Sequence, residues 1–257
     1  MAAERSVEVL FTPADFETLR ERDLSDTTCV VFDVLRATSS MVTALANGAE
    51  ALIPVSEIAE ALEIKRKDPQ VLLAGERDGL RIEANLTGSI NFDLGNSPRE
   101  FTKDRIAGKK IVITTTNGTR ALRSCAHAKA ILVSSFLNLK ATAEHLAKVK
   151  PAKLIVICSG TFEQTAYEDV LGAGALCEPI MQNSAGNLSV ADSALMAVTL
   201  FREAKSDLFG SMALSRNARR LLFRPELQGD IAFCLQRDIF GFATTMDKYG
   251  VVSRITC

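Results

Sequence analysis

Short apolar runs alternate with helical patterns along most of this chain, and this alternation constrains its fold more than any other feature. The runs lack a clean alternation of apolar and polar side chains, as expected of strands covered on both faces of a sheet. We predict strands at residues 28–32, 51–55, 71–74, 110–114, 130–133 and 154–157.

Helical periodicity fills the intervals between these runs. Residues 57–67 follow a plausible N-cap at Ser56, and residues 141–149 form a second pattern that Pro151 ends. The order strand, helix, parallel strand is typical of α/β proteins. We therefore predict a three-layer α/β/α fold with a largely parallel or mixed sheet, whose strand-end loops form one cleft.

The last third of the chain departs from this pattern. We predict two helices there, at residues 192–204 and 207–223, followed by short strands at residues 230–234 and 240–243. Earlier in the chain, residues 75–99 are the least regular stretch and are rich in Gly, Asn, Ser and Asp. Loops of that length inside a compact domain are usually functional.

The length of 257 residues suits one large domain or two small lobes. We predict a single catalytic domain over residues 1–257. If it divides into two lobes, they should meet at the cleft, with a boundary near residue 150.

Composition argues against several classes of function. The chain has 30 Lys and Arg against 31 Asp and Glu, and its aromatic share is 6% without any Trp. Neither feature favours nucleic acid or an anionic membrane as a partner. No apolar stretch approaches the ~18–20 residues of a membrane span, and the first residues lack the apolar segment of a signal peptide. The six cysteines are scattered without a Cys-x-x-Cys pair, so we expect reduced thiols and a cytoplasmic location.

Polar side chains follow four of the predicted strands. These turns comprise residues 33–40, 114–120, 134–136 and 158–161, and they contain many hydroxyls together with Arg36 and Arg120. In a parallel sheet such ends open on one edge, where helix N-termini favour an anion such as a phosphate or a sulfonate. Each turn taken singly is better explained as a helix cap. The four turns together favour an anion site.

Carboxylates occur at the same level of the predicted sheet. Oxygen ligands that converge beside a phosphate site suit Mg²⁺, although any one acid is as well explained by a surface ion pair or a turn cap. The acidic candidates are Asp33, Glu76, Glu168, Asp169 and Asp238. Arg77 and Arg99 bracket the irregular stretch and suit a second anionic group of the substrate, or simply solvent.

Several well-known catalytic motifs are absent from the sequence. There is no G-x-x-x-x-G-K-[ST] loop, and Leu35 stands where an Asp-x-Asp phosphatase would carry its second aspartate. Gln164 stands where a Cys-x₅-Arg loop starting at Cys158 would need arginine. The basic stripe of Arg216, Arg219, Arg220 and Arg224 is typical of a solvated helix face, with a substrate or RNA patch as the less favoured interpretation.

Four motifs in register carry a family resemblance. They are VFDVLRATSS, GERDG followed by FDLGNSPREF, TTTNGTRAL and CSGTFEQTAYEDVLGAGAL. This arrangement resembles the 2-phosphosulfolactate phosphatase family over residues 33–174, with a looser similarity over residues 229–238. The resemblance implies a three-layer α/β fold and a Mg²⁺-dependent acid phosphatase of coenzyme M biosynthesis. That enzyme converts (2R)-2-phospho-3-sulfolactate to 3-sulfolactate and phosphate.

The resemblance also implies site residues by motif position. As catalytic candidates we take Asp33, Arg36 and Cys158. The candidates for binding the substrate or its phosphate are Ser39, Ser40, Arg77, Ser97, Arg99, Thr115, Thr116, Asn117, Gly118, Thr119, Ser159 and Gly160. The candidate metal ligands are the five acids named above. Residues 83–91 make a longer connection than the family pattern suggests, which bears on the identity of the substrate.

Two hypotheses of different classes follow. The first is a Mg²⁺-dependent phosphatase acting on a small polyanionic phosphoester, whose nucleophile is Asp33, Cys158 or a metal-bound water. The second is a binding protein that keeps the anion site without turnover, which the clustered carboxylates disfavour. We expect a homodimer only because that is the commonest oligomeric state.

Overall fold

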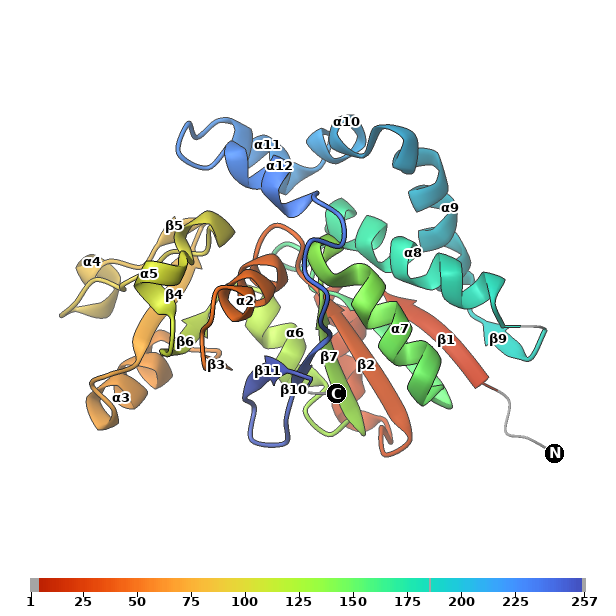
Figure 1. The fold of residues 1–257 in the computed structure, drawn as a ribbon, viewed down its shortest axis with the longest axis horizontal. Coiled ribbons are helices and arrows are strands. Elements are labelled where there is room, and N and C mark those ends of the chain that lie inside the picture. Colours follow the sequence, from red (N-terminus) through yellow and green to blue (C-terminus); the bar gives the residue numbers. More distant parts are fainter. Residues whose placement is uncertain (1–4, 185, 256–257) are drawn as a thin grey trace.

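The computed structural model describes residues 5–184 and 186–255, and it contains one large sheet with helices on both faces (Figure 1). The sheet has 11 strands in the order β5-β4-β6-β3-β11-β10-β7-β2-β8-β1-β9. The strands are β1 (Arg5–Leu10), β2 (Thr27–Phe32), β3 (Ala51–Pro54), β4 (Leu72–Arg77), β5 (Leu80–Arg81), β6 (Lys110–Thr114), β7 (Ala130–Ser134), β8 (Lys153–Cys158), β9 (Leu188–Val190), β10 (Thr244–Met246) and β11 (Val252–Arg254).

The α-helices connect these strands and also form most of the C-terminal third. They are α1 (Pro13–Glu17), α2 (Ala37–Ala46), α3 (Ile58–Lys67), α4 (Ala84–Thr87), α5 (Lys103–Ile106), α6 (Gly118–Ser124), α7 (Leu139–Val149), α8 (Tyr167–Gln182), α9 (Asp192–Ala204), α10 (Leu208–Ala213), α11 (Arg216–Leu222) and α12 (Gly229–Cys234). Short 3₁₀ turns are η1 (Thr18–Glu21), η2 (Pro98–Glu100), η3 (Phe136–Asn138) and η4 (Lys205–Asp207).

Strand β2 shows why the molecule has three layers. Its side chains alternate between two separate cores: Val30 and Phe32 belong to one, and Cys29 and Val31 belong to the other. Helices α7, α8, α9 and α12 cover the first core, and α1, α2 and α6 cover the second. Because both faces are buried, the strand sequence is continuously apolar. The predicted three-layer α/β fold with a mixed sheet is confirmed.

The sheet consists of two parallel groups that run in opposite senses. Strands β4, β6 and β3 are parallel to one another, and so are β7, β2, β8, β1 and β9. The antiparallel hairpin of β10 and β11 joins the groups, since β10 pairs antiparallel with β7 and β11 pairs antiparallel with β3. Figure 1 shows one group on each side of this hairpin.

This arrangement corrects the premise that all the polar strand ends open on one edge of a parallel sheet. In a flat sheet, the carboxyl ends of β2 and β6 would lie at opposite edges. The two strand ends nevertheless meet. Asp33, the residue after β2, contacts Gly118 at the start of α6. The sheet therefore curls between its two halves, and the curl brings the two sets of strand ends together.

All six predicted strands are present within one to three residues of the expected bounds. The helix predicted at residues 192–204 is confirmed, and those predicted at 57–67 and 141–149 are α3 and α7. Helix α3 begins one residue later than predicted, with Glu57 rather than Ser56 at its N-cap.

The C-terminal third contains the errors. Residues 230–234 form helix α12 instead of a strand, and the late strands are β10 and β11 instead of residues 240–243. The helix predicted at 207–223 is divided into α10 and α11, because Ser215 ends the first and caps the second by accepting from the amide of Ala218. The irregular stretch at 75–99 holds the end of β4, β5 and α4.

None of the helices within residues 5–184 and 186–255 has both the length and the apolar character needed to cross a bilayer. Cys29, Cys125, Cys158, Cys177 and Cys234 are buried free thiols, as predicted. Cys257 lies outside the described residues.

Candidate active site

A cavity of about 90 Å³ opens where the carboxyl ends of β2, β4, β6 and β8 converge. The residues at these strand ends that line the cavity include Asp33, Glu76, Thr116, Asn117 and Gly160. Helix α11 and the residues after it line it as well. A polar cavity of this size suits a small ligand rather than a polymer.

Asp33 follows β2 and faces this cavity. Its Oδ1 accepts a hydrogen bond of 2.9 Å from the amide of Ala37, the first residue of α2. Gly118 lies so close that a Cβ there would be 2.6 Å from Asp33 Oδ2. No residue that the structure describes donates a hydrogen bond to Oδ2. Burial, together with the carboxylates of Glu76 and Glu168, raises the pKa of Asp33 to about 7.

Glu168 and Asp169 lie in the first turn of helix α8, buried and outside the lining of the cavity. Asp169 accepts from the amides of Val34 at 2.8 Å and Gly160 at 3.1 Å, and so ties the loop after β2 to the loop after β8. Glu168 Oε1 accepts from Asn217 at 2.6 Å, whereas its Oε2 is buried without a partner among the described residues. Burial raises the pKa of both carboxyls, and that of Asp169 is raised further by Asp33.

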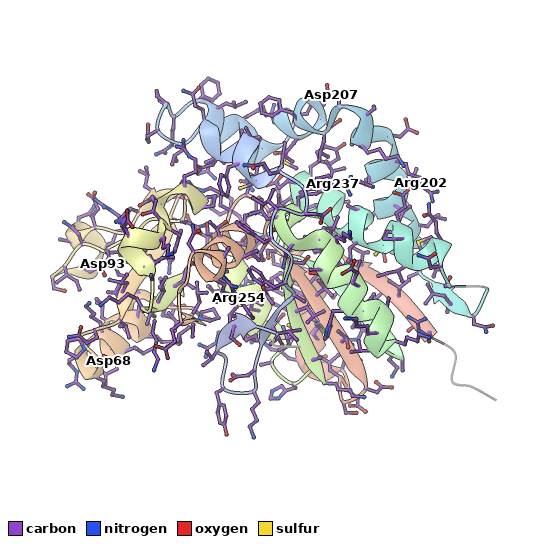
Figure 2. The ribbon with its side chains drawn as sticks, viewed as in Figure 1. Asp68, Asp93, Arg202, Asp207, Arg237 and Arg254 are labelled. Carbon is purple, nitrogen blue, oxygen red and sulfur yellow. The ribbon has the colours of Figure 1, made fainter. Side chains whose placement is uncertain are left out.

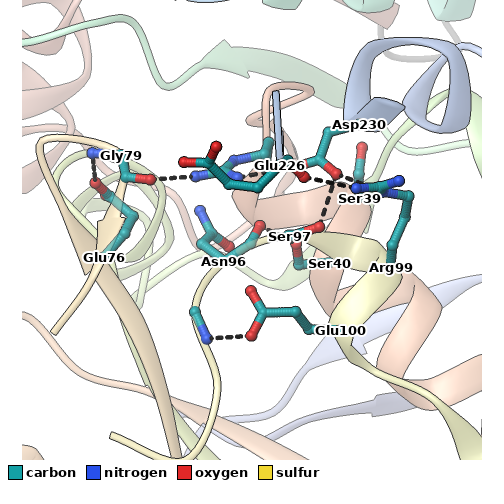
Figure 3. Close-up of polar contacts among 12 residues, drawn as sticks. Ser39, Ser40, Glu76, Gly79, Asn96, Ser97, Arg99, Glu100, Glu226 and Asp230 are labelled. Carbon is teal, nitrogen blue, oxygen red and sulfur yellow. Dashed lines mark hydrogen bonds and ion pairs between the residues drawn. The ribbon is translucent and has the colours of Figure 1, made fainter. Parts of the chain in front are cut away.

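Glu76 lies at the end of β4 and organises the loops around it. Its Oε1 accepts from the amide and the hydroxyl of Thr116, at 2.8 and 3.0 Å. Its Oε2 accepts from the amide of Gly79 at 2.7 Å (Figure 3). Glu76 therefore fixes the turn after β6 against the β4–β5 turn.

Arg36 is held in a buried network that reaches the C-terminal third of the chain. Figure 3 shows the acid of this network, Asp230, with Ser97 and Arg99. Arg36 Nη1 donates to Asp230 at 2.8 Å, and its Nη2 donates to the carbonyl of Gly79 at 2.8 Å. Asp230 also accepts from Ser97 Oγ at 2.7 Å and from Arg99 Nε at 2.9 Å. The buried Asp230 therefore joins predicted site residues from two distant segments, Arg36 in one and Ser97 and Arg99 in the other.

Most of the predicted hydroxyl ligands bond the backbone instead of facing the cavity. Ser39 donates to the carbonyl of Val34, and Ser40 donates to that of Asn96. Thr115 and Thr119 bond each other across the first turn of α6. These bonds are not helix caps, because neither α2 nor α6 has a side-chain bond at its N-cap. The capping alternative is confirmed at the turn after β7, where Ser135 accepts from the amide of Leu137.

The turn after β6 nevertheless faces the cavity with Thr116 and Asn117. Asn117 Nδ2 donates to the carbonyls of Ser159 at 3.0 Å and Phe162 at 2.8 Å, across to the loop after β8. Asn117 Oδ1 is buried with no partner among the described residues, and so is Ser159 Oγ. Buried polar atoms without partners are costly unless a ligand, an ion or a water satisfies them.

The predicted metal cluster does not form as a group of acids. Among residues 5–184 and 186–255, no set of three or more His, Cys, Asp or Glu side chains is placed to hold a metal ion. Mg²⁺, however, commonly takes one or two carboxylates and completes its shell with waters and substrate oxygens. The unsatisfied oxygens of Asp33, Glu168 and Asn117 are hard donors of that kind, so the residues at the cavity fit a Mg²⁺ ion.

A family model described as 2-phosphosulpholactate phosphatase matches residues 14–248 of the chain. The chain belongs to this family. It is 37% identical over 233 residues to a probable 2-phosphosulfolactate phosphatase of Caldicellulosiruptor saccharolyticus, covering 89% of this chain and 93% of the relative.

Further relatives carry the same name. A probable 2-phosphosulfolactate phosphatase of Thermotoga maritima is 39% identical over 213 residues, which is 83% of this chain and 86% of the relative. One of Caldanaerobacter subterraneus is 36% identical over 250 residues, which is 96% of this chain and 95% of the relative.

Some predicted site residues of this 2-phosphosulpholactate phosphatase family member lie away from the cavity. Arg77 donates to the carbonyl of Glu76 and to Thr114 Oγ1. Arg120 forms exposed ion pairs with Glu17 and Glu163.

Asp238 is also remote from the cavity. It accepts at 2.6 Å from the amide of Lys140 in α7. Its neighbour Arg237 lies over the ring of Phe201 in α9, beside helix α8 (Figure 2). Asp238 therefore does not join the other predicted metal ligands.

Cys158 ends β8 but is fully buried. Burial raises the pKa of its thiol well above the usual value, and the carboxylates of Asp169 and Glu168 raise it further. A thiol in that environment stays protonated and is a poor nucleophile. The burial of Cys158 therefore disfavours this thiol as the nucleophile.

Sequence reasoning missed the contribution of the C-terminal third to the cavity of this family member. Asn217, Arg220 and Arg224 line it, and Asp230 anchors Arg36. The one signal available was Asp230, a lone acid in front of the apolar run 231–234. The arginines had the pattern of a solvated helix face.

Two residues of the cavity wall have a strained backbone. Asp78 and Phe162 adopt the left-handed region, with φ of 54° and 52°. This conformation is uncommon outside glycine, and for a bulky residue such as phenylalanine it is exceptional. Such strain concentrates at functional sites.

Proposed function

We propose that the chain is a Mg²⁺-dependent phosphatase that hydrolyses (2R)-2-phospho-3-sulfolactate to 3-sulfolactate and phosphate. The relatives' names support the reaction, and the length of the match, residues 14–248, includes every element around the cavity. We place this substrate in sulfonate metabolism, in the biosynthesis of coenzyme M.

The observation that carries the proposal is the state of Asp33. It is a carboxylate at the end of β2, with one oxygen held by the amide of Ala37 and the other left without a donor at the cavity. A partly satisfied carboxylate whose pKa is raised to about 7 is unfavourable unless a cation or a reacting group completes it.

We propose that Asp33 and Glu168 hold the metal together with the amide oxygen of Asn117. Bound there, Mg²⁺ would neutralise charge on the phosphoryl oxygens during a loose, in-line transfer. Asp169 would keep the loops after β2 and β8 in register through its two backbone amides.

The chain's own residues would position the phosphoester. Thr116 and Asn117 face the cavity at the turn before α6, where peptide groups at a helix start favour an anion. Arg36 lies buried beside them, and Asp230 fixes its guanidinium. Positioned charge of this kind is the main source of catalysis in phosphoryl transfer.

The test is phosphate release by the purified protein. Racemic phosphosulfolactate, phospholactate and p-nitrophenyl phosphate would be compared with Mg²⁺ and with EDTA. We expect Mg²⁺-dependent release with a strong preference for the sulfonate. Release from the other esters alone would refute the substrate, and equal release in EDTA would refute the metal.

A further inference from the structure

Helix α11 forms part of the cavity wall opposite the strand ends. Three of its residues contact the loop after β8 and the first turn of α8. Arg216 bonds Gln164, Asn217 bonds Thr161 and Glu168, and Arg220 lies over the ring of Phe162 at 5.5 Å. These contacts fix the position of α11. The side chains of α11 that line the cavity are therefore held in place.

The charges around the cavity show which cations remain available to a ligand. Three arginines line it, namely Arg36, Arg220 and Arg224. The charge of Arg36 is already matched by the buried Asp230, and both of its terminal nitrogens are used. The N–H groups that Arg36 has left can serve the phosphoryl group, and a further acidic group of the substrate needs another cation.

Arg220 and Arg224 are in the opposite situation. Among the described residues, Arg220 forms an ion pair only with Asp78, at the outer limit of 4.0 Å, and both side chains are exposed. Arg224 is half-buried and forms no ion pair with any residue that the structure describes. Arg224, a half-buried cation at the cavity wall, is costly without an anion to join it there, and the exposed Arg220 has no close acidic partner to compete with such an anion.

Arg77 and Arg99, the pair that the sequence analysis assigned to a second anionic group, do not meet this requirement. Arg77 is bonded to its own strand and to Thr114, and neither arginine lines the cavity. Arg99 is bonded to Asp230 and to the carbonyl of Glu226. Both arginines serve the structure around the cavity.

We propose that Arg220 and Arg224 are the specificity-determining residues, and that they bind the acidic groups of the substrate other than its phosphoryl group. This inference rests on the proposed function, since it concerns the same cavity. Guanidinium groups bind the oxygens of a sulfonate or a carboxylate through two parallel hydrogen bonds. Binding a non-reacting part of the substrate in this way selects polyanionic esters over simple ones.

The test is the double variant R220Q/R224Q, with R219Q as the matched control. Arg219 is exposed on the same short helix and does not line the cavity. We expect the double variant to lose at least about tenfold in kcat/KM on phosphosulfolactate, from the loss of charged hydrogen bonds. On p-nitrophenyl phosphate, which carries no further acidic group, it should keep the wild-type value. R219Q should match the wild type on both.

Three results would overturn the inference: an equal loss on both esters, no loss on either, or an equal loss in R219Q. R224K keeps the charge and removes the planar fork, so its kcat/KM on phosphosulfolactate should be intermediate. Thermal melting of each variant would establish that the comparison is made between folded proteins.

A binding measurement separates this inference from the proposed function. Calorimetric titration of 3-sulfolactate into the wild type, R219Q and R220Q/R224Q requires no turnover. We expect binding to the first two and at least tenfold weaker binding to the double variant. If the wild type hydrolyses no phosphosulfolactate, the proposed function fails. In this binding measurement, the inference fails if the double variant binds 3-sulfolactate as tightly as the wild type, or if the wild type does not bind it.

Discussion

Arg36 and Asp230 form a buried ion pair of 2.8 Å between residues that are 194 positions apart in the chain. Arg36 is 4% exposed and Asp230 is 0% exposed. The pair joins the turn after β2 to helix α12, and so makes the C-terminal third part of the cavity wall. Arg99 and Ser97 complete the shell of Asp230 (Figure 3).

Asp230→Asn should lower both stability and activity. It leaves the buried Arg36 without its counter-charge, which typically costs about 3–5 kcal/mol. Urea denaturation measures the change in the free energy of unfolding. Because Arg36 also loses its orientation, we expect KM for the phosphoester to rise by at least about tenfold. Asp238→Asn, which alters an acid remote from the cavity, should leave KM unchanged. An unchanged KM in Asp230→Asn would contradict the positioning role of Asp230.

Asp33→Asn should lower kcat by at least a hundredfold while the protein stays folded. The amide keeps the size of the side chain but cannot carry the charge that faces the cavity. Phosphate release under saturating substrate gives kcat, and circular dichroism monitors the fold. Activity within a few-fold of the wild type would remove Asp33 from the mechanism.

Gly118→Ala should also reduce activity, through Asp33. A Cβ at this position would lie 2.6 Å from Asp33 Oδ2 and 2.6 Å from the Cβ of Ala37, so the carboxylate or the helix start has to move. We expect kcat/KM to fall by about tenfold or more. The matched control is Gly241→Ala, because a Cβ at Gly241 meets nothing within 4 Å. If the two variants were equally active, the close approach of Gly118 to Asp33 would have no role in the reaction.

Cys158→Ala should keep kcat within about threefold of the wild type. The thiol is buried and its raised pKa keeps it protonated, so it takes no part in the reaction. The small cavity left behind should cost on the order of 1 kcal/mol in the free energy of unfolding. A hundredfold loss of kcat in a folded variant would restore Cys158 as the nucleophile.

Stability without metal should fall as the pH rises from about 4 to about 7. The pKa of Asp33 is 3.8 in the unfolded chain and about 7 in the folded one, so between these values the folded state binds more protons. A group of this kind stabilises the protein below its unfolded pKa and loses that contribution as pH rises through its folded pKa. Glu168 and Asp169 shift in the same direction.

Denaturation in EDTA at pH 5 and pH 8 measures this dependence. At ~1.4 kcal/mol per pKa unit, Asp33 contributes at most about 4 kcal/mol to it. Asp33→Asn should flatten the pH dependence, and added Mg²⁺ should stabilise the wild type more at pH 8 than at pH 5. If the wild type in EDTA were more stable at pH 8 than at pH 5, the raised pKa of these buried acids would be wrong.

Local pattern was sufficient to predict most of the sheet. The runs that became β2, β6, β7 and β8 are apolar because each strand is buried on both faces, and burial leaves its mark residue by residue. The same logic identified Asp33, an acid directly after such a run. The C-terminal third was harder to predict, because helices α11 and α12 are short and make their decisive contacts with distant turns.

The sequence by itself determined six of the strands, the family and the polar turns that supply Asp33, Thr116 and Asn117. Only the tertiary structure decided that Ser39 and Ser40 bond the backbone, that Asp238 lies elsewhere, and that Arg220 and Arg224 line the cavity. Hydrophobic periodicity predicts whether a side chain is buried, but it does not predict which distant group the side chain contacts. The meeting of the two sets of strand ends depends on how β10 and β11 join the two halves of the sheet, through pairings between residues more than a hundred positions apart.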